Sequence, residues 1–219
     1  FFSILFGIIF IEIFGNFIGL GNPLLYEPDP LVGYRLRPNQ SQKRRNNAKV
    51  TTDNEGFRID PSNEIKKDSE FIVFVGDSVT YGGSYVDDTK IFSSIYCKSL
   101  KTNSICLNNG INSWGTMNMG RFIENYDIYS KKIPKEIFLV ILPGDEKRNF
   151  RSFSDTPFWS NSPKAPAAIN EVIKFITLRY FIPKLSQSDQ NDFIKKNIRN
   201  SEIKNNLQLD LAWEELEIY

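Results

Sequence analysis

The sequence predicts an α/β domain built on a mostly parallel sheet. Residues 71–75 form a continuous apolar run, and the predicted strand at residues 136–142 is apolar after Glu136, which is typical of strands buried on both faces. Residues 104–107 form a shorter apolar strand between them, and apolar residues at helical spacing separate the three strands. Strand and helix therefore alternate along the chain, and this order favours parallel strands joined by right-handed crossovers.

Residues 1–20 are very apolar and read FFSILFGIIFIEIFGNFIGL. A membrane-spanning helix needs about 20 mostly apolar residues, and Glu12 interrupts this run. Three interpretations are open: a membrane anchor, which we favour, the core of a signal peptide, or a buried core helix. No small-residue cleavage site follows the run, which weighs against the signal peptide.

Residues 21–69 are expected to form a small β-rich lead-in and a linker. Turns rich in Pro and Asn alternate there with short extended pieces at residues 33–36 and 48–52. The polar run at residues 61–70 is a predicted connecting loop. The basic triplet at residues 43–45 is predicted to be a solvated turn.

Residues 70–219 are expected to form the main domain. A long loop at residues 145–165 carries Phe158 and Trp159, which form either a lid over a ligand site or, as we favour, part of an ordinary packed loop. Within that loop, residues 146–148 are predicted to be a solvated charged turn. The helical patterns of this domain cover residues 89–100, 117–129, 165–180 and 195–219.

Composition excludes some classes of function. The chain has 27 basic and 26 acidic residues, a balance that argues against a nucleic-acid binder. It has no His and two cysteines, Cys97 and Cys106, on a predicted helix and a predicted strand. We expect both to be small core residues rather than a bridge or a metal site. No metal or organic cofactor is expected.

Three loops follow the carboxyl ends of the predicted strands. Residues 76–83, 108–116 and 144–149 are all dense in Gly, Ser, Asn and Asp. In an open α/β sheet, ligands bind outside the carboxyl ends of the strands. The three loops together predict a site at this edge. Trp114 and Met117 are expected either to line it or to pack in the core.

The first loop is the most informative, because Gly-Asp-Ser-Val-Thr at residues 76–80 directly follows an apolar strand. A nucleophilic Ser needs an exposed Oγ and nearby backbone N–H groups to hold an oxyanion. A strand-to-helix turn supplies both, which makes Ser78 a candidate nucleophile. The alternative is that Asp77 and Ser78 only cap a helix. A phosphate-binding loop is disfavoured, since no Lys follows at Walker spacing.

Residues 76–80 resemble the first sequence block of SGNH/GDSL hydrolases, whose nucleophile is this Ser. Residues 108–116 are similar to the second block, and residues 141–145 stand where the third block is expected. The resemblance implies a flavodoxin-like α/β/α three-layer fold. It also implies hydrolysis of an acyl or acetyl ester through an acyl-enzyme.

The lead-in carries the same resemblance. An apolar helix followed by residues 28–36 and 54–58 is similar to membrane-anchored bacterial members of the family. The resemblance to the family covers roughly residues 1–150. The resemblance implies a domain outside the cytoplasm, attached to the membrane through residues 1–20.

The resemblance also implies an oxyanion hole made by the backbone N–H groups of Ser78 and Ser113, where the family has Gly at the second position. The third position is normally Asn and is here Asp145, which accepts but cannot donate hydrogen bonds when ionised. Losing one such donor typically costs about 10²–10³ in rate. Auxiliary candidates near these groups are Asp77, Gly110, Asn112 and Asn149.

The family's last block, Asp-x-x-His, is absent from these 219 residues. A Ser hydroxyl is a poor nucleophile without a general base. We expect the block to follow Tyr219, so that this stretch alone is inactive. The alternative is a lineage that lost catalysis.

The sequence thus predicts a serine ester hydrolase acting on a small-molecule or glycan ester. One alternative is a carbohydrate O-acyltransferase, which passes the same acyl group to a sugar hydroxyl. The other is an inactive, membrane-anchored binding protein on the same scaffold.

Overall fold

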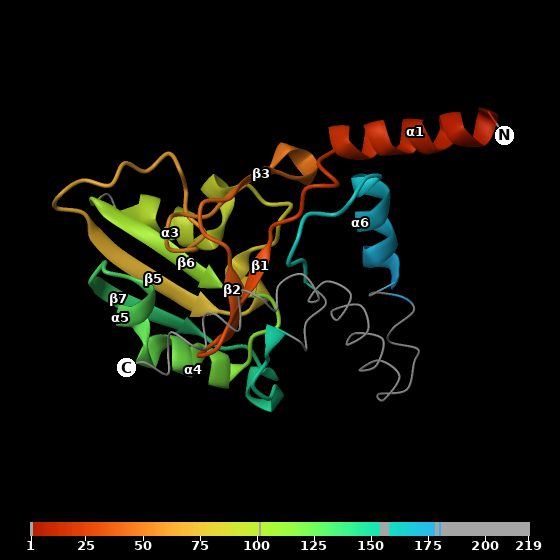
Figure 1. Cartoon of the computed structure of the whole chain (residues 1–219). Helices are drawn as coiled ribbons and strands as arrows, with labels where there is room; N and C mark the ends of the chain where they lie inside the picture. The colour runs from red at the N-terminus through yellow and green to blue at the C-terminus, as the bar shows by residue number, and fades with distance from the viewer. Residues whose placement is uncertain (1, 101, 154–157, 178–179, 181–219) are drawn as a thin grey trace, which may run out of the picture.

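A three-stranded parallel sheet with the strand order β6-β5-β7 lies at the centre of the fold (Figure 1). The predicted α/β class with a parallel sheet is confirmed. The computed structural model describes residues 2–100, 102–153, 158–177 and 180. Within them the sheet strands are β5 (Glu70–Gly76), β6 (Ser104–Gly110) and β7 (Pro134–Val140).

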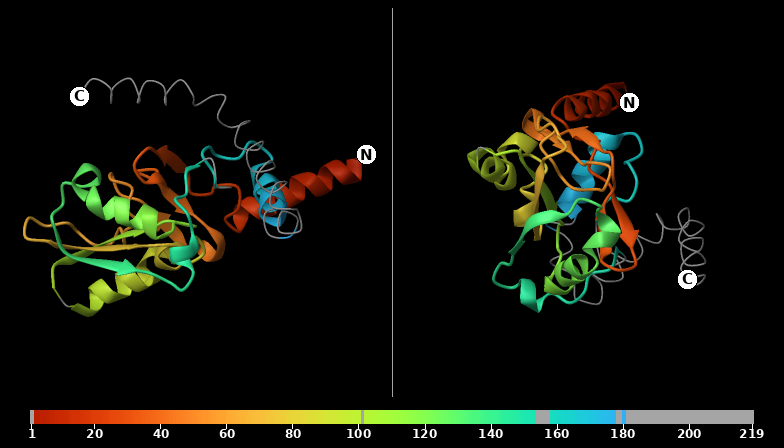
Figure 2. Two further views of the ribbon diagram at one scale, coloured as in Figure 1. Left: turned by 90° about the horizontal axis from the view of Figure 1, so that it is seen from below. Right: turned by 90° about the vertical axis from the view of Figure 1, so that its left-hand side faces the viewer.

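Helices cover both faces of the sheet (Figure 2). Side chains alternate along a strand, so Ile72 and Phe74 of β5 face helix α3 (Phe92–Leu100). Val73 and Val75 face the opposite way and join the larger core with helix α4 (Thr116–Glu124). Both faces of β5 are therefore buried, in agreement with its continuous run of apolar residues.

Strand β7 corrects one expectation. Its apolar run predicted a buried strand, but β7 pairs with β5 on one side and exposes much of its length. Ile137 is 37% exposed and Leu139 is 44% exposed. An apolar strand is buried on both sides only where other elements cover both faces of the sheet. The described helices cover β7 only in part.

Several boundaries also differ from the predictions. The helix expected from residue 89 begins at Phe92, because Ile91 is extended, and the next helix breaks at Asn125. Strand β6 continues to Gly110, where a loop was expected. The predicted helix at residues 195–219 lies outside the described residues. Further helical elements of this domain are α2 (Ser78–Tyr81), η2 (Asp88–Lys90), α5 (Tyr126–Tyr129), η3 (Asp145–Lys147) and α6 (Ala167–Ile176).

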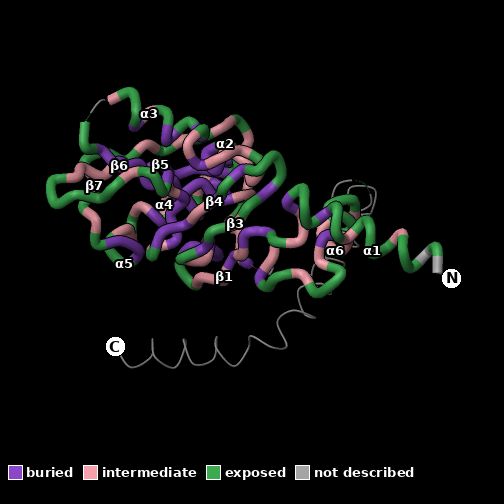
Figure 3. The backbone as a smooth tube through the Cα atoms, turned by 90° about the horizontal axis from the view of Figure 1, so that it is seen from above, coloured by how far each residue is buried: buried purple, intermediate pink, exposed green. Residues whose placement is uncertain are grey.

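Two antiparallel hairpins precede the sheet, in the region where short extended pieces were expected. Tyr34, Leu36 and Val50 of these hairpins share one hydrophobic core with Val73 of the sheet. This core forms the buried interior in Figure 3. The hairpins are β1 (Tyr26–Asp29) with β2 (Gly33–Leu36), and β3 (Ser41–Lys43) with β4 (Lys49–Thr51), the last two joined by η1 (Arg45–Asn47).

The apolar N-terminal run forms helix α1 (Phe2–Phe17), which extends away from the sheet beside α6 (Figures 1 and 3). The buried-helix interpretation is wrong, because most described side chains of α1 face solvent. No helix among the described residues combines the length and the apolar character needed to cross a membrane. The exposed large side chains of α1 are Leu5, Phe6, Ile8, Ile9, Phe10, Ile11, Ile13, Phe14 and Phe17.

Glu12, which interrupts the apolar run, caps helix α6. Its carboxylate accepts hydrogen bonds from the backbone N–H groups of Ala168 and Ile169, both at 3.1 Å. The N-cap residue of α6 is Pro166, which has no side chain able to accept such bonds. The acidic residue of α1 therefore satisfies free donors at the start of another helix.

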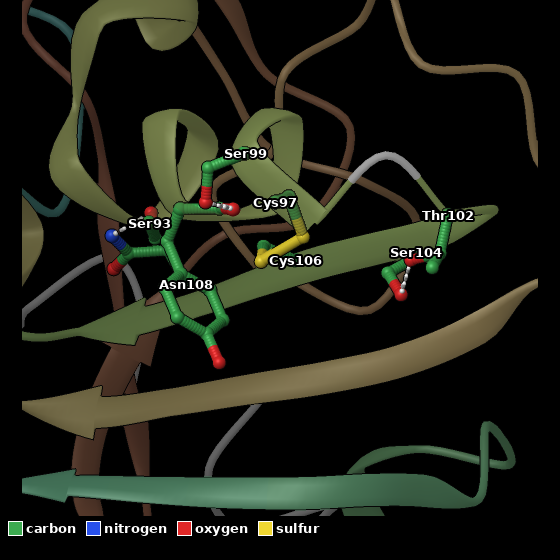
Figure 4. The surroundings of a disulfide bond; sticks show 8 residues. Ser93, Cys97, Ser99, Thr102, Ser104, Cys106 and Asn108 are labelled. Atoms are coloured by element: carbon green, nitrogen blue, oxygen red, sulfur yellow. Dashed lines mark hydrogen bonds between the residues drawn. A yellow bond between two sulfur atoms is a disulfide. The ribbon is translucent and has the colours of Figure 1, made fainter.

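Cys97 and Cys106 form a disulfide with a Cα–Cα distance of 5.9 Å (Figure 4). The expectation that they are not bridged is wrong, although both are buried in the core between α3 and β6. Packing of α3 on β6 sets the two side chains against each other. The sequence assigns each cysteine to an element, but it does not show which residues of the two elements face one another.

Candidate active site

Ser78 begins α2 directly after the central strand β5. Asp77 is the N-cap of this helix, and its carboxylate accepts a hydrogen bond from Val79 N–H at 2.8 Å. The capping interpretation is therefore correct for Asp77. The neighbouring Ser78 is exposed, and its Oγ lies 3.4 Å from an Asp77 carboxylate oxygen. That distance makes the contact weak, so the hydroxyl is available to a ligand.

The backbone N–H groups of Ser78 and Ser113 have no hydrogen-bond partner within the described part of the chain. Ser113 has a φ of 66°, in the left-handed region that favours Gly. This is the position where the family resemblance expects Gly. The two loops are neighbours, because Gly76 pairs with Gly110 and Ile111 N–H donates to Gly76 O at 3.0 Å.

Gly110, the last residue of β6, brings this strand against helix α2. A Cβ at this residue would lie 2.0 Å from the backbone N of Tyr81. Its own N–H donates to the side-chain oxygen of buried Asn108 at 2.8 Å and is not free for a ligand. Gly110 thus positions α2 and does not offer its N–H group to a ligand.

Asp145 is fully buried, and one of its carboxylate oxygens accepts a hydrogen bond from Leu142 N–H at 2.8 Å. Its other oxygen lies 3.0 Å from Nη1 of Arg148. The same nitrogen lies 3.1 Å from the Asp77 carboxylate and donates to Trp114 O at 2.9 Å. One guanidinium therefore holds both buried carboxylates.

Arg148 is a site residue that the sequence analysis missed. The turn at residues 146–148 is solvated at Glu146 and Lys147, as predicted, but Arg148 is half-buried. A run of charged residues gives no sign that one of them pairs with acids from a distant loop. Only the packing of the loops brings these groups together.

Asn112 is held by the lead-in. Its side chain donates to the Tyr26 hydroxyl at 2.8 Å, and the Tyr34 hydroxyl donates to its backbone oxygen at 2.6 Å. Trp114 is fully buried and donates to Tyr34 O, so it is a core residue. Met117 is exposed.

Asn149 is also exposed. No hydrogen bond among the described residues joins it to the loops around Ser78. The structure therefore brings Asp77, Ser78, Asn112 and Ser113 into two adjacent loops and leaves Asn149 outside them.

Arg58 fixes the chain that follows α2. It is fully buried and donates to the backbone oxygens of Tyr81 and Gly83, at 2.7 and 2.8 Å. It also forms a 2.8 Å ion pair with buried Asp88. Burial raises the pKa of Asp88 to about 6, although the charge of Arg58 acts in the opposite direction. This lead-in residue thus determines the position of a loop beside Ser78.

A cavity of about 690 Å³ lies beside Ser78. Its walls come from the lead-in, the loop after α2, the Phe158–Trp159 segment and helix α6. Burial raises the pKa of Tyr81 to about 12 and that of Tyr26 well above its usual value, so both phenols stay neutral. The residues that line the cavity include Tyr26, Arg44, Ser78, Asn112, Phe158, Trp159, Glu171 and Lys174.

Phe158 and Trp159 form one wall of this cavity. The Phe158 ring stacks on Tyr26 with 4.8 Å between centroids, and Trp159 O accepts a hydrogen bond from Tyr26 N–H at 2.7 Å. These contacts agree with a packed loop. Lys174 of α6 contributes a cation whose Nζ lies 3.8 Å from the Trp159 ring centroid.

Arg44 corrects another expectation. Its triplet was predicted to be a solvated turn, but Arg44 is 6% exposed and its guanidinium binds the Glu171 carboxylate of α6. Lys43 and Arg45 on either side are exposed, as predicted. The ion pair attaches the lead-in to α6 and places both charges on the cavity wall.

No protein-family model matches the chain, and no curated protein sequence matches it. Among the described residues there is also no group of three or more His, Cys, Asp or Glu side chains arranged to hold a metal ion. The functional interpretation therefore depends on the fold and on the surroundings of Ser78.

Proposed function

We propose that this chain carries the nucleophile of a serine ester hydrolase of the SGNH/GDSL type, on a flavodoxin-like α/β/α scaffold. The observation that carries the proposal is the position of Ser78. It is exposed at the start of a helix that follows the central parallel strand. Two backbone N–H groups without partners among the described residues, those of Ser78 and Ser113, lie in adjacent loops.

In this mechanism Ser78 Oγ attacks the carbonyl carbon of an acyl or acetyl ester. The alcohol leaves, an acyl-enzyme forms, and water releases the acid. The N–H groups of Ser78 and Ser113 stabilise the oxyanion. In the family that the site resembles, a His of an Asp-x-x-His block takes the proton of the nucleophilic Ser and passes it to the leaving alcohol. These 219 residues contain no His.

Asp145 replaces the Asn expected at the third oxyanion position. An unpaired carboxylate there would oppose a developing negative charge. The contact with Arg148 supports the proposal, because the guanidinium, which Asp145 shares with Asp77, offsets part of the negative charge of Asp145. The hole is then formed by two donors rather than three.

Two observations support an exported protein associated with a membrane. Disulfides such as Cys97–Cys106 persist mainly in oxidising compartments outside the cytosol. The apolar side chains exposed along α1 offer a surface suited to lipid.

Labelling of the full-length gene product with a fluorophosphonate probe tests the nucleophile. We expect Ser78 to be labelled and Ser78→Ala to abolish the label. Ser84→Ala, which alters another serine of the cavity wall, should leave it unchanged. Absence of labelling in well-folded protein would contradict the hydrolase and favour the binding-protein alternative. Product analysis with an added sugar then separates hydrolysis from acyl transfer.

A further inference from the structure

Lys174 is a cation on the wall of the cavity beside Ser78, and it has no acidic partner among the described residues. Its Nζ lies over the face of Trp159, 3.8 Å from the ring centroid. Among the residues the structure describes, no carboxylate lies within ion-pair distance of it. Burial of its amine lowers the pKa of Lys174 to about 8, while the ring face favours the charged form.

The nearest acidic residue on the same helix is already engaged. Glu171, three residues before Lys174, binds the guanidinium of Arg44 and accepts a hydrogen bond from Gly21 N–H at 2.6 Å. Among the described residues, the charged side chains of the cavity wall are Arg44, Glu171 and Lys174, with one positive charge in excess. An unpaired, partly desolvated ammonium group is unfavourable until an anion reaches it.

The remaining walls suit the body of an organic ligand. Tyr26, Phe158, Trp159 and Phe175 surround the cavity with apolar faces, and the Asn112 side chain adds a polar group. Binding sites commonly combine such apolar walls with a few polar groups that fix orientation. Ser78 lines the same cavity, so a single ligand can contact both Ser78 and the wall that carries Lys174.

We propose that this cavity selects an anionic ester substrate, whose carboxylate or phosphate group binds Lys174 while its ester reaches Ser78. The position of the ester depends on the proposed hydrolase function. The anion site depends only on the cavity and its charges. The two can therefore be tested separately.

Ligand-observed NMR titration of the full chain tests the anion site with benzoate, phenyl phosphate and the neutral benzyl alcohol. We expect at least one anion to bind about 10-fold or more tightly than the alcohol, in line with a charged hydrogen bond. Lys174→Gln should abolish this preference and Lys174→Arg should keep it. Lys67→Gln removes the same charge from an exposed residue away from the cavity and should change nothing.

Equal binding of all three compounds, or a preference for anions that persists in Lys174→Gln, would overturn the proposal. The stronger of the two anions shows whether the site takes a carboxylate or a phosphate. Ser78→Ala should leave the anion preference unchanged. A negative labelling result, which contradicts the hydrolase, can therefore be told apart from a negative titration, which contradicts the anion site.

Discussion

The guanidinium of Arg148 lies 3.1 Å from the carboxylate of Asp77, the residue immediately before the candidate nucleophile. The same nitrogen, Nη1, lies 3.0 Å from Asp145 and donates to Trp114 O. Asp77 follows β5, Trp114 follows β6 and Asp145 begins the turn after β7. One side chain thus connects the loops at the carboxyl ends of all three sheet strands.

Replacing this side chain should destabilise the fold. In Arg148→Met the carboxylates of Asp77 and Asp145, which are 2% and 0% exposed, lose their cation. Breaking a buried pair typically costs 3–5 kcal/mol; Arg148 is about one-third exposed, so we expect about 2 kcal/mol from urea denaturation. Lys147→Met, at the exposed neighbour, is the control. A variant as stable as the wild type would show that the pairs contribute nothing.

A pair of glycine substitutions tests the contact between β6 and helix α2. Gly110→Ala places a Cβ 2.0 Å from Tyr81 N and should lower the free energy of unfolding by about 3 kcal/mol. Gly120→Ala, inside α4, places its Cβ more than 4 Å from every atom outside the helix backbone around it and should raise the free energy of unfolding by up to about 1 kcal/mol. Both are measured by chemical denaturation. Equal effects of the two substitutions would contradict the close approach.

The disulfide gives a chemical prediction. Denatured but unreduced protein should show no free thiol in a colorimetric titration, and two after reduction, since Cys97 and Cys106 are the two cysteines of the sequence. The double variant Cys97→Ala/Cys106→Ala should be less stable by about 2–3 kcal/mol, given the short loop that the bridge closes. Its stability should not respond to reductant. Two reactive thiols without reduction would refute the bridge.

Binding of benzoate should depend on pH through Lys174. The pKa of this amine is lowered to about 8, so it is charged below that pH and loses its charge above it. We expect the affinity for benzoate to fall as pH rises from 7 to 9. In Lys174→Gln the affinity should be low and flat across this range.

The other titratable groups of the cavity wall are not expected to change the affinity for benzoate between pH 7 and 9. Arg44 and Glu171 form an ion pair, and the raised pKa values of Tyr26 and Tyr81 keep both phenols neutral. Tyr85 also lines the cavity, so Tyr85→Phe serves as the control. A pH dependence that persists in Lys174→Gln would assign the effect to another group.

Local patterns were sufficient to predict the three sheet strands, although not the bounds of every element. The apolar runs identified β5, β6 and β7, and their alternation with helices identified the parallel sheet. The turn after β5 identified Ser78 as an exposed residue at a helix start. Each of these features depends on a few consecutive residues, whose spacing and backbone preferences carry the information.

The sequence by itself therefore determined the α/β class, the order of the strands along the chain and the candidate nucleophile. Tertiary structure decided which distant groups meet: Cys97 with Cys106, Glu12 with the start of α6, and Arg148 with two buried carboxylates. It also decided that Lys174 lines the cavity beside Ser78. The physical reason is that burial and pairing depend on how elements pack, and residues far apart in sequence carry no local sign of their contact.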